Sequence, residues 1–388
     1  MTAEWYDLAQ RCYAARSGRP VPRLLHSPVP TIANPVAVRA QVGNGSVRVT
    51  ATAPGAPPRA ARGDDALRLL GELGVQITAA ESRTLVCDDP ATLPALLHLA
   101  RRAEGDGPLG DVAAHVGWWA DRGDFPGSGA VVRLIDACRT RWLTGTTPAA
   151  EADPATWRAW LAVTDDGCAG LLTMLDRLTA DEPLPRLNSI TDDDTWTWGK
   201  AQSDHADGFD WRRPDSTGRA ATGLRARCDA ADLYAAALLT DPLYRRRAVH
   251  TGHVVIGVAN HSAKARNRIT VDCHRMDARL RVGNTVTGWA GGADDSPYDR
   301  FHGTIADTGV SGGHLMLTLS GVTANKPDPG VTVSICQAAP DPYTLRNGRH
   351  RYQRLYATRR SWLTTGRTPT PTRRDVPLDV LVAGAEGD

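Results

Sequence analysis

Lysine is almost absent from this chain of 388 residues, which has only Lys200, Lys264 and Lys326. Arginine takes its place, and alanine, glycine and proline are abundant, which indicates a GC-rich genome. This bias raises the arginine content for reasons unrelated to function. Single arginines therefore carry little information, and only their clusters are taken as signs of a binding site.

Long apolar runs are missing as well. No stretch approaches the ~18 apolar residues of a transmembrane helix, and the first residues, MTAEWYDLAQRCYAARSG, carry charges throughout. They lack the apolar region of a signal peptide. We therefore expect no membrane span and no membrane partner, and a cytoplasmic location.

Several chemical motifs are absent too. The seven cysteines are scattered and never form C-x-x-C, so neither a disulfide framework nor a zinc knuckle is indicated. No G-x-x-x-x-G-K-[ST] or H-E-x-x-H occurs, and we recognise neither a G-x-G-x-x-G dinucleotide-binding fingerprint nor a G-x-S-x-G nucleophile elbow. We expect no cofactor and no metal, and we assign no catalytic residue.

The composition that remains is that of a folded protein. Hydrophobic residues make up 41% and charged residues 23%, close to ordinary globular usage. The length favours two or three domains. We predict an α+β multidomain protein with a small α+β N-terminal domain, a helical middle and a small SH3/OB-like β-barrel near the C-terminus. The expected boundaries are 1–29 for an N-terminal helix and linker, 30–104, 105–248, 249–340 for the barrel, and 341–388 for a basic helix and tail.

The segment 30–104 shows the pattern of a small α+β domain. VAVRAQV and SVRVTAT are two alternating runs joined by GNG, a strong hairpin signal. DDALRLLGELG suits a helix begun by Asp64 or Asp65, GVQITAA and RTLVCDD resemble a second hairpin, and ATLPALLHLARRA a second helix. The expected order is ββαββα.

The segment 105–248 is mostly helical in pattern and holds most of the tryptophan. Tryptophans at helical spacing usually form core or inter-helix packing, because each can bury ~150–250 Å². For Trp196 and Trp198, base stacking or a ligand pocket remains an alternative. The tryptophans concerned are Trp118, Trp119, Trp142, Trp157, Trp160, Trp196, Trp198 and Trp211.

After Arg247 the pattern changes to short strands ended by Gly, Asn, Asp or Pro: GHVVIGVAN, RITVDCH, ARLRV, NTVTGWA, FHGTIAD, GHLMLTLS and GVTVSIC. Six or seven such strands in about 90 residues favour a small closed barrel. Gly283 and Asn284 permit a tight turn between strands, and we expect Val282 and Val286 to point inward.

This arrangement resembles SH3-like barrels of KOW type, and also the accessory β-barrel of Upf1-like superfamily 1 helicases, where an RVGDxV turn and a later GxV strand recur. The matching residues here are Arg281, Val282, Gly283, Asn284, Val286, Gly303 and Ile305. The resemblance implies binding to nucleic acid or to a nucleoprotein machine. Because the phosphate-binding motif of the motor is missing, it implies an accessory part or partner of a helicase or other ATPase.

Charge is unevenly distributed. Residues 1–194 hold 24 acidic and 19 basic residues, and residues 195–388 hold 19 acidic and 26 basic ones. The excess is concentrated at 346–374, which contains no acid. The guanidinium group of arginine has forked N–H donors that fit the oxygens of a phosphate, and tyrosine rings stack on unpaired bases. The candidate nucleic-acid-binding residues are Arg281, Arg346, Arg349, Arg351, Arg354, Arg359, Arg360, Tyr352 and Tyr356, with Arg245–Arg247 and Lys264–Arg268 as extensions.

Three hypotheses remain open. The first is a non-catalytic accessory protein that binds DNA or RNA. The second is a protein–protein adaptor that docks through the barrel and the final strand, 376–388, in which case the arginines pair with the acidic N-terminal half. The third is a metal-dependent nuclease using the carboxylates of 192–210 and His205. Zinc binding by His250, His253, Cys273 and His274 is less favoured than a structural role.

Overall fold

The computed structural model describes residues 2–43, 45–103, 107–260, 267–295, 300–323 and 325–358. It confirms the α+β fold, with mixed sheets and a closed barrel in the C-terminal half. Two compact units are distinguished: unit 1 comprises Met1–Arg213 and Arg227–Pro342, and unit 2 comprises Pro214–Ala226 and Tyr343–Asp388. Among the helices described, none combines the length and apolar character needed to cross a membrane.

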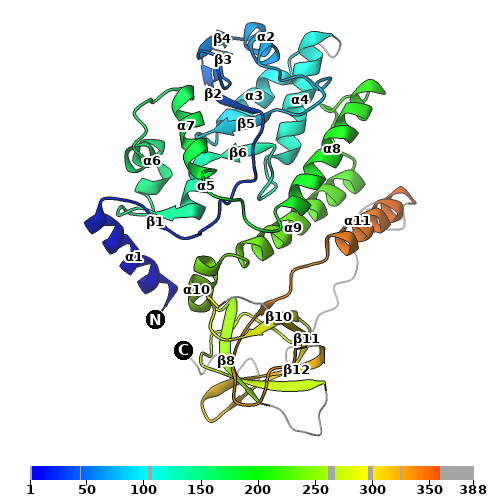
Figure 1. Cartoon of the computed structure of the whole chain (residues 1–388). Coiled ribbons are helices and arrows are strands. Elements are labelled where there is room, and N and C mark those ends of the chain that lie inside the picture. Colours follow the sequence, from blue (N-terminus) through cyan, green and yellow to red (C-terminus); the bar gives the residue numbers. More distant parts are fainter. Residues whose placement is uncertain are drawn as a thin grey trace, which may run out of the picture. The chain divides into compact units, whose positions relative to one another are not determined.

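The N-terminal part of unit 1 is built on a five-stranded mixed sheet (Figure 1). Its order is β4-β3-β2-β5-β6, from β2 (Pro35–Gly43), β3 (Ser46–Thr52), β4 (Arg59–Arg62), β5 (Thr84–Cys87) and β6 (Val131–Arg133). Strands β2, β3 and β4 are antiparallel neighbours, as the GNG turn predicted for the first pair. Strands β5 and β6 run parallel to β2.

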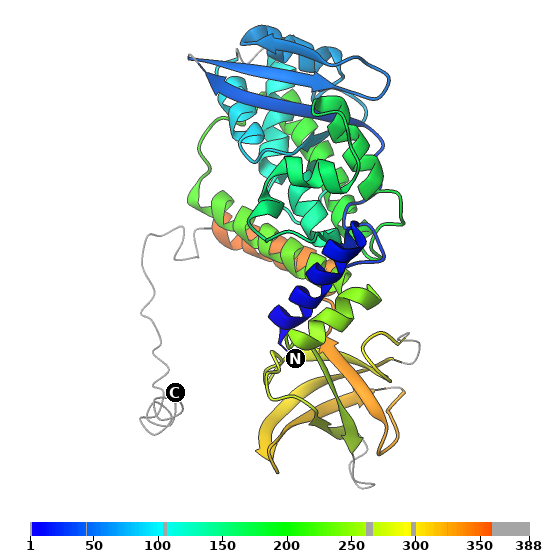
Figure 2. The same cartoon turned by 90° about the vertical axis from the view of Figure 1, so that its left-hand side faces the viewer.

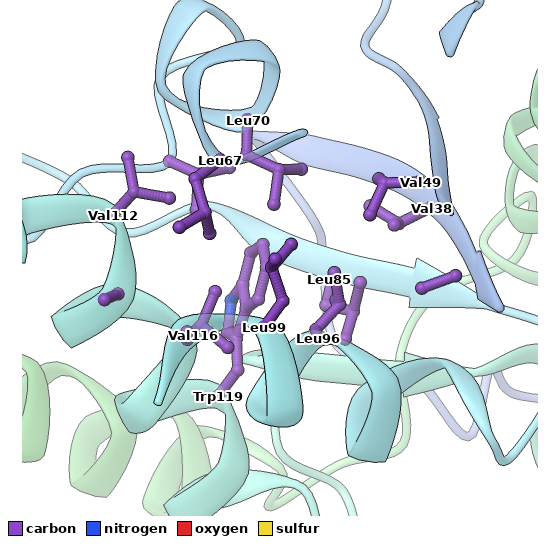
Figure 3. Packing of buried hydrophobic residues seen from close by; sticks show 14 of the residues in the cluster. Val38, Val49, Leu67, Leu70, Leu85, Leu96, Leu99, Val112, Val116 and Trp119 are labelled. Atoms are coloured by element: carbon purple, nitrogen blue, oxygen red, sulfur yellow. The ribbon is translucent and has the colours of Figure 1, made fainter. Parts of the chain in front are cut away.

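Helices cover both faces of this sheet. On one face lie α2 (Asp64–Glu72), α3 (Thr92–Ala100) and α4 (Pro108–Arg122), and their leucines and valines meet Val38, Val49 and Leu85 from the strands (Figure 3). On the other face, α5 (Leu134–Arg141), α6 (Pro154–Trp160) and α7 (Cys168–Leu178) pack against Ala37, Val86 and Val132. The period-2 alternation of the strands divides their side chains between two cores.

Three local predictions here were wrong. Residues 75–80 form no strand, so RTLVCDD has no hairpin partner there and β5 inserts between β2 and β6 instead. The order is therefore βββαβα rather than ββαββα. Helix α2 begins after Gly63 without a side-chain cap, so neither Asp64 nor Asp65 caps it. Residues 131–133 are a strand in a segment whose pattern suggested only helix.

The N-terminal helix is confirmed as α1 (Ala3–Ser17). The proline-bearing segment after it, expected to be a linker, is buried in part. Its β1 (Val21–Pro22) pairs with β7 (Trp142–Leu143), and Leu24 and Val29 belong to the hydrophobic cores. The rest of the helical middle consists of η1 (Ala150–Ala152), α8 (Asn188–Ala206), α9 (Thr217–Leu238) and α10 (Pro242–His250).

Tryptophan packing largely follows the prediction. Trp118, Trp119, Trp157 and Trp198 are buried. Trp198 packs against His115 and Trp118, with ring centroids 4.7 and 4.9 Å away, so its ring is not available for base stacking. Trp196 is exposed.

The predicted barrel is a closed, fully antiparallel sheet of six strands in the order β10-β11-β12-β9-β8-β13 (Figure 2). Phe301, Leu317, Leu319, Val333 and Ile335 fill its interior. Its strands are β8 (Val254–Asn260), β9 (Arg268–Cys273), β10 (Thr285–Ala290), β11 (Arg300–Ser311), β12 (His314–Thr323) and β13 (Thr332–Gln337).

The VGN turn ties the segment before β10 to β11. Gly283 has φ +89°, and its N–H donates to the Ile305 carbonyl at 2.8 Å. The Asn284 side chain accepts from the N–H of Arg281 at 2.7 Å. Val286 points inward as predicted, but Val282 is 58% exposed and Leu280 is buried near it. The ARLRV segment forms no strand, because its backbone is used in this turn.

Candidate nucleic-acid interface

The most basic part of the described chain is unit 2. Its residues 214–226 and 343–358 include six arginines and a single acid, Asp215. The arginines are Arg219, Arg225, Arg346, Arg349, Arg351 and Arg354. They come from the first half of α9 and from α11 (Pro342–Ala357), which lie side by side in both views of the molecule (Figures 1 and 2).

Helix α11 has two unlike faces. Leu345, Leu355 and Tyr356 are half-buried, and positions 345 and 356 lie about three helical turns apart on the same side of the helix. Arg346, Arg351 and Arg354 are exposed, and none of them makes an ion pair with a residue that the structure describes. Proline at the first helical position begins the helix with a preset φ.

One aromatic group joins the two helices of unit 2. The guanidinium carbon of Arg225 lies 5.5 Å from the centre of the Tyr352 ring, within reach of a cation–π interaction. The Tyr352 and Tyr356 rings stack with centroids 6.2 Å apart. Tyr352 remains 38% exposed, and Tyr343 at the start of α11 is 70% exposed. Arginine forks and tyrosine rings therefore share this surface.

The structure distributes the predicted binding residues as follows. Arg346, Arg349, Arg351, Tyr352, Arg354 and Tyr356 lie on α11, while Arg359 and Arg360 fall outside the described residues. Arg281 belongs to the barrel in unit 1, and its guanidinium donates to the carbonyls of Ala278 and Leu280 at 2.7 and 3.1 Å. Arg281 thus helps to close its own turn.

Arg245–Arg247, the expected extension of the basic face, serve internal contacts instead. Arg245 is buried and donates to the carbonyls of Ala293 and Thr240 at 2.6 and 2.9 Å. Arg246 pairs with Asp294, and Arg247 pairs with Asp7 at 2.9 Å. That part of the basic-face prediction was wrong, because nearby carbonyls and carboxylates already use these donors. Of the second extension, Lys264–Arg266 fall outside the described residues and Arg268 is exposed.

The carboxylates of 192–210 do not converge. Asp194 is buried and accepts from Arg122 Nε at 2.8 Å and from the Gly129 N–H at 2.8 Å. Burial raises the pKa of Asp194, and the Arg122 charge opposes this shift. Three of the other carboxylates are in ion pairs: Asp193 with Arg122, Asp204 with Lys200, and Asp210 with Arg212. Their role is to fix α8 and the following loop.

Histidines are similarly engaged. His205 contacts Asp111 at 2.8 Å, and His250 stacks on Tyr6. Over the part of the chain that the structure describes, no group of three or more His, Cys, Asp or Glu side chains is placed to hold a metal ion. Neither the zinc-binding hypothesis nor the hypothesis of a metal-dependent nuclease at 192–210 therefore finds a group of metal ligands among these residues.

The arginines of α9 were not among the predicted binding residues. Arg219 and Arg225 lie more than 100 residues before α11, and no acid other than Asp215 occurs between 214 and 226. The local charge count was the available signal. Helical periodicity alone does not reveal it.

Comparison with known proteins gives no relative: no protein-family description matches the chain, and neither the curated proteins nor the solved structures contain a significant match.

Proposed function

We propose that this protein binds nucleic acid without catalysing a reaction on it, and that the basic helix pair of unit 2, formed by residues 217–226 of α9 and by α11, makes the phosphate contacts. The resemblance of the barrel to KOW-type barrels and to the accessory barrels of Upf1-like helicases is a further ground for this proposal. On that basis, the chain serves as an accessory factor to a separately encoded helicase or other ATPase.

The observation that supports it is the state of the arginines. In unit 1, arginines are repeatedly matched to carboxylates, as in Arg11 with Glu151 and Arg39 with Asp88. In unit 2, Arg346, Arg351 and Arg354 are exposed and make no ion pair with a described residue, whereas Arg219 pairs with Asp215 at 3.0 Å. Unneutralised arginine on a helix attracts a polyanion and releases its counterions.

The aromatic groups favour a strand with unpaired bases. Tyr343 and Tyr352 present ring surface beside the arginines, and every base offers a π-face on which such rings stack. We therefore expect tighter binding to single-stranded than to duplex oligonucleotides.

The test is fluorescence anisotropy of labelled single-stranded and duplex oligonucleotides across a salt series. For the wild type, log K should fall linearly with log salt, with a slope of about −0.7 per phosphate contact on single strands. Arg351→Gln/Arg354→Gln should weaken binding to all sequences alike, because phosphates carry no base information. It should also reduce the slope by about 1.4 on single strands, because two phosphate contacts are lost.

The matched control is Arg68→Gln, an exposed arginine on α2 that pairs with Asp65 in unit 1. It should leave both affinity and slope unchanged. Absence of binding at low salt, or equal losses in the control and in the double variant, would refute the proposed interface.

A further inference from the structure

The N-terminal helix α1 is seated with its polar side inward. Asp7 pairs with Arg23 at 3.0 Å and with Arg247 at 2.9 Å. Arg11 holds Glu151 at 2.7 Å and the Thr146 carbonyl at 2.7 Å. Charged side chains thus share with Ala14 and Tyr6 the face that a surface helix normally fills with apolar ones.

The apolar side of α1 points away from the protein. Trp5 is 66% exposed, Leu8 is 48% exposed and Cys12 is exposed as well. These residues are spaced by three and four positions, so they form a single stripe along the helix. Figures 1 and 2 both show α1 at the periphery of unit 1.

Polar contacts with other described residues fix the orientation of this helix. Rolling it inward would break the ion pairs of Asp7 and Arg11 and leave the carboxylate of buried Glu151 without its arginine. Ala15 is also fixed, because Gly145 approaches so closely that a Cβ there would lie 2.5 Å from the Ala15 Cα. None of the residues that the structure describes covers the stripe.

The charges that flank the stripe indicate which cover fits. Exposed Glu4 lies at one end and exposed Arg16 at the other. When two copies of α1 pack antiparallel about a two-fold axis near position 10, Glu4 of each copy faces Arg16 of the other, and Leu8 faces Cys12. The helix dipoles also oppose each other favourably in this arrangement. Such an interface is self-complementary, as two-fold symmetry requires.

We infer that the exposed face of α1, formed by Glu4, Trp5, Leu8, Cys12 and Arg16, is the contact through which two copies of this chain associate as an antiparallel helix pair. A single pair of 15-residue helices makes a small interface, below the area of stable complexes. We expect a weak dimer, with a Kd on the order of 10–100 µM.

Sedimentation velocity over a concentration series tests the association. The wild-type protein should shift from monomer to dimer, and Leu8→Glu should remain monomeric over the same range. Leu224→Glu is the matched control, because Leu224 is an equally exposed leucine on α9, and it should dimerise like the wild type. Circular dichroism shows whether each variant is folded.

Charge exchange tests the antiparallel register. Glu4→Arg alone and Arg16→Glu alone should each weaken the dimer, because like charges then meet across the axis. The double variant Glu4→Arg/Arg16→Glu should recover most of the association, since the pairs are restored with reversed sign. Only a pairing of α1 with another α1 in opposite direction predicts this recovery.

Crosslinking gives an independent readout. In this register the two Cys12 residues lie four positions apart along the axis, about 6 Å. In a Cys228→Ser background, which removes the other exposed cysteine, a short bis-maleimide should yield a covalent dimer through Cys12. A protein that stays monomeric at high concentration, a dimer that Leu8→Glu leaves intact, or a failed charge-exchange recovery would each overturn the inference.

Discussion

At the scale of single residues, His115 shows what it means to bury a titratable group among aromatic rings. Its ring lies 4.9 Å from that of Trp119 and 4.7 Å from that of Trp198. Burial lowers the pKa of His115 to about 4, whereas an unfolded histidine titrates near 6.5. The side chain is therefore neutral in the folded protein at pH 7.

This shift predicts an acid-sensitive core. Below pH 6.5, His115 binds a proton in the unfolded chain but not in the folded one. The free energy of unfolding should therefore fall by up to ~1.4 kcal/mol per pH unit. The loss should total about 3 kcal/mol near pH 4. Denaturant titrations from pH 7 to pH 4 measure it. His115→Phe should flatten the dependence, whereas the exposed His98→Phe should not; equal profiles for the two variants would assign the acid sensitivity to other groups.

At the scale of elements, Asp241 holds two segments together. Its carboxylate is fully buried and caps α10 by accepting from the N–H groups of Leu243 and Tyr244. The other oxygen accepts from the N–H groups of Leu25 and His26 at 2.7 and 3.0 Å. The His26 ring lies against the same oxygen at 2.8 Å. One side chain thereby fixes both a helix start and the buried proline-bearing segment.

Asp241→Ala should accordingly destabilise the protein by ~3–5 kcal/mol, the cost of leaving buried donors unpaired. Asp153→Ala removes a cap of the same kind from α6, where the carboxylate accepts from the Ala155 N–H. That loss should be only ~1 kcal/mol, because the site is exposed. Chemical denaturation of both variants gives the comparison. Equal losses of stability in the two variants would mean that the contacts of Asp241 with residues 25 and 26 contribute nothing to the free energy of unfolding.

How far these elements follow from the sequence depends on the range of the contacts that form them. The hairpin of β2 and β3 was predictable, since a turn of three residues specifies it. Strand β5 was placed wrongly, because its neighbours are β2 and the three-residue β6, both distant in sequence. The same holds for the site: the arginines of α11 form a local cluster, whereas Arg225 joins them only through the folded contact with Tyr352.

At the scale of the whole chain, the barrel is attached to the rest of unit 1 through α10. Arg245 is 4% exposed and donates to carbonyls on both sides of the junction, Thr240 before α10 and Ala293 after β10. It donates also to Asp295, and its guanidinium lies 5.5 Å from the ring of Trp289. No carboxylate pairs with it in these contacts, so the carbonyl dipoles balance its charge.

This arrangement predicts that Arg245 couples the unfolding of the barrel to that of the five-stranded sheet. Arg245→Met keeps much of the volume but leaves these carbonyls without a donor, and it should cost ~3–5 kcal/mol. The neighbouring Arg246→Met removes only an exposed ion pair with Asp294 and should cost less than ~1 kcal/mol of stability.

Native-state hydrogen exchange distinguishes a loss of stability from a loss of coupling between the barrel and the sheet. In the wild type, the slowest amides of the barrel and of the sheet should exchange through one common unfolding. In Arg245→Met the barrel amides should exchange at a lower free energy than the sheet amides. If the two sets still exchange together, the junction is held by the apolar contacts among Ala248, Val254 and Trp289 rather than by the arginine.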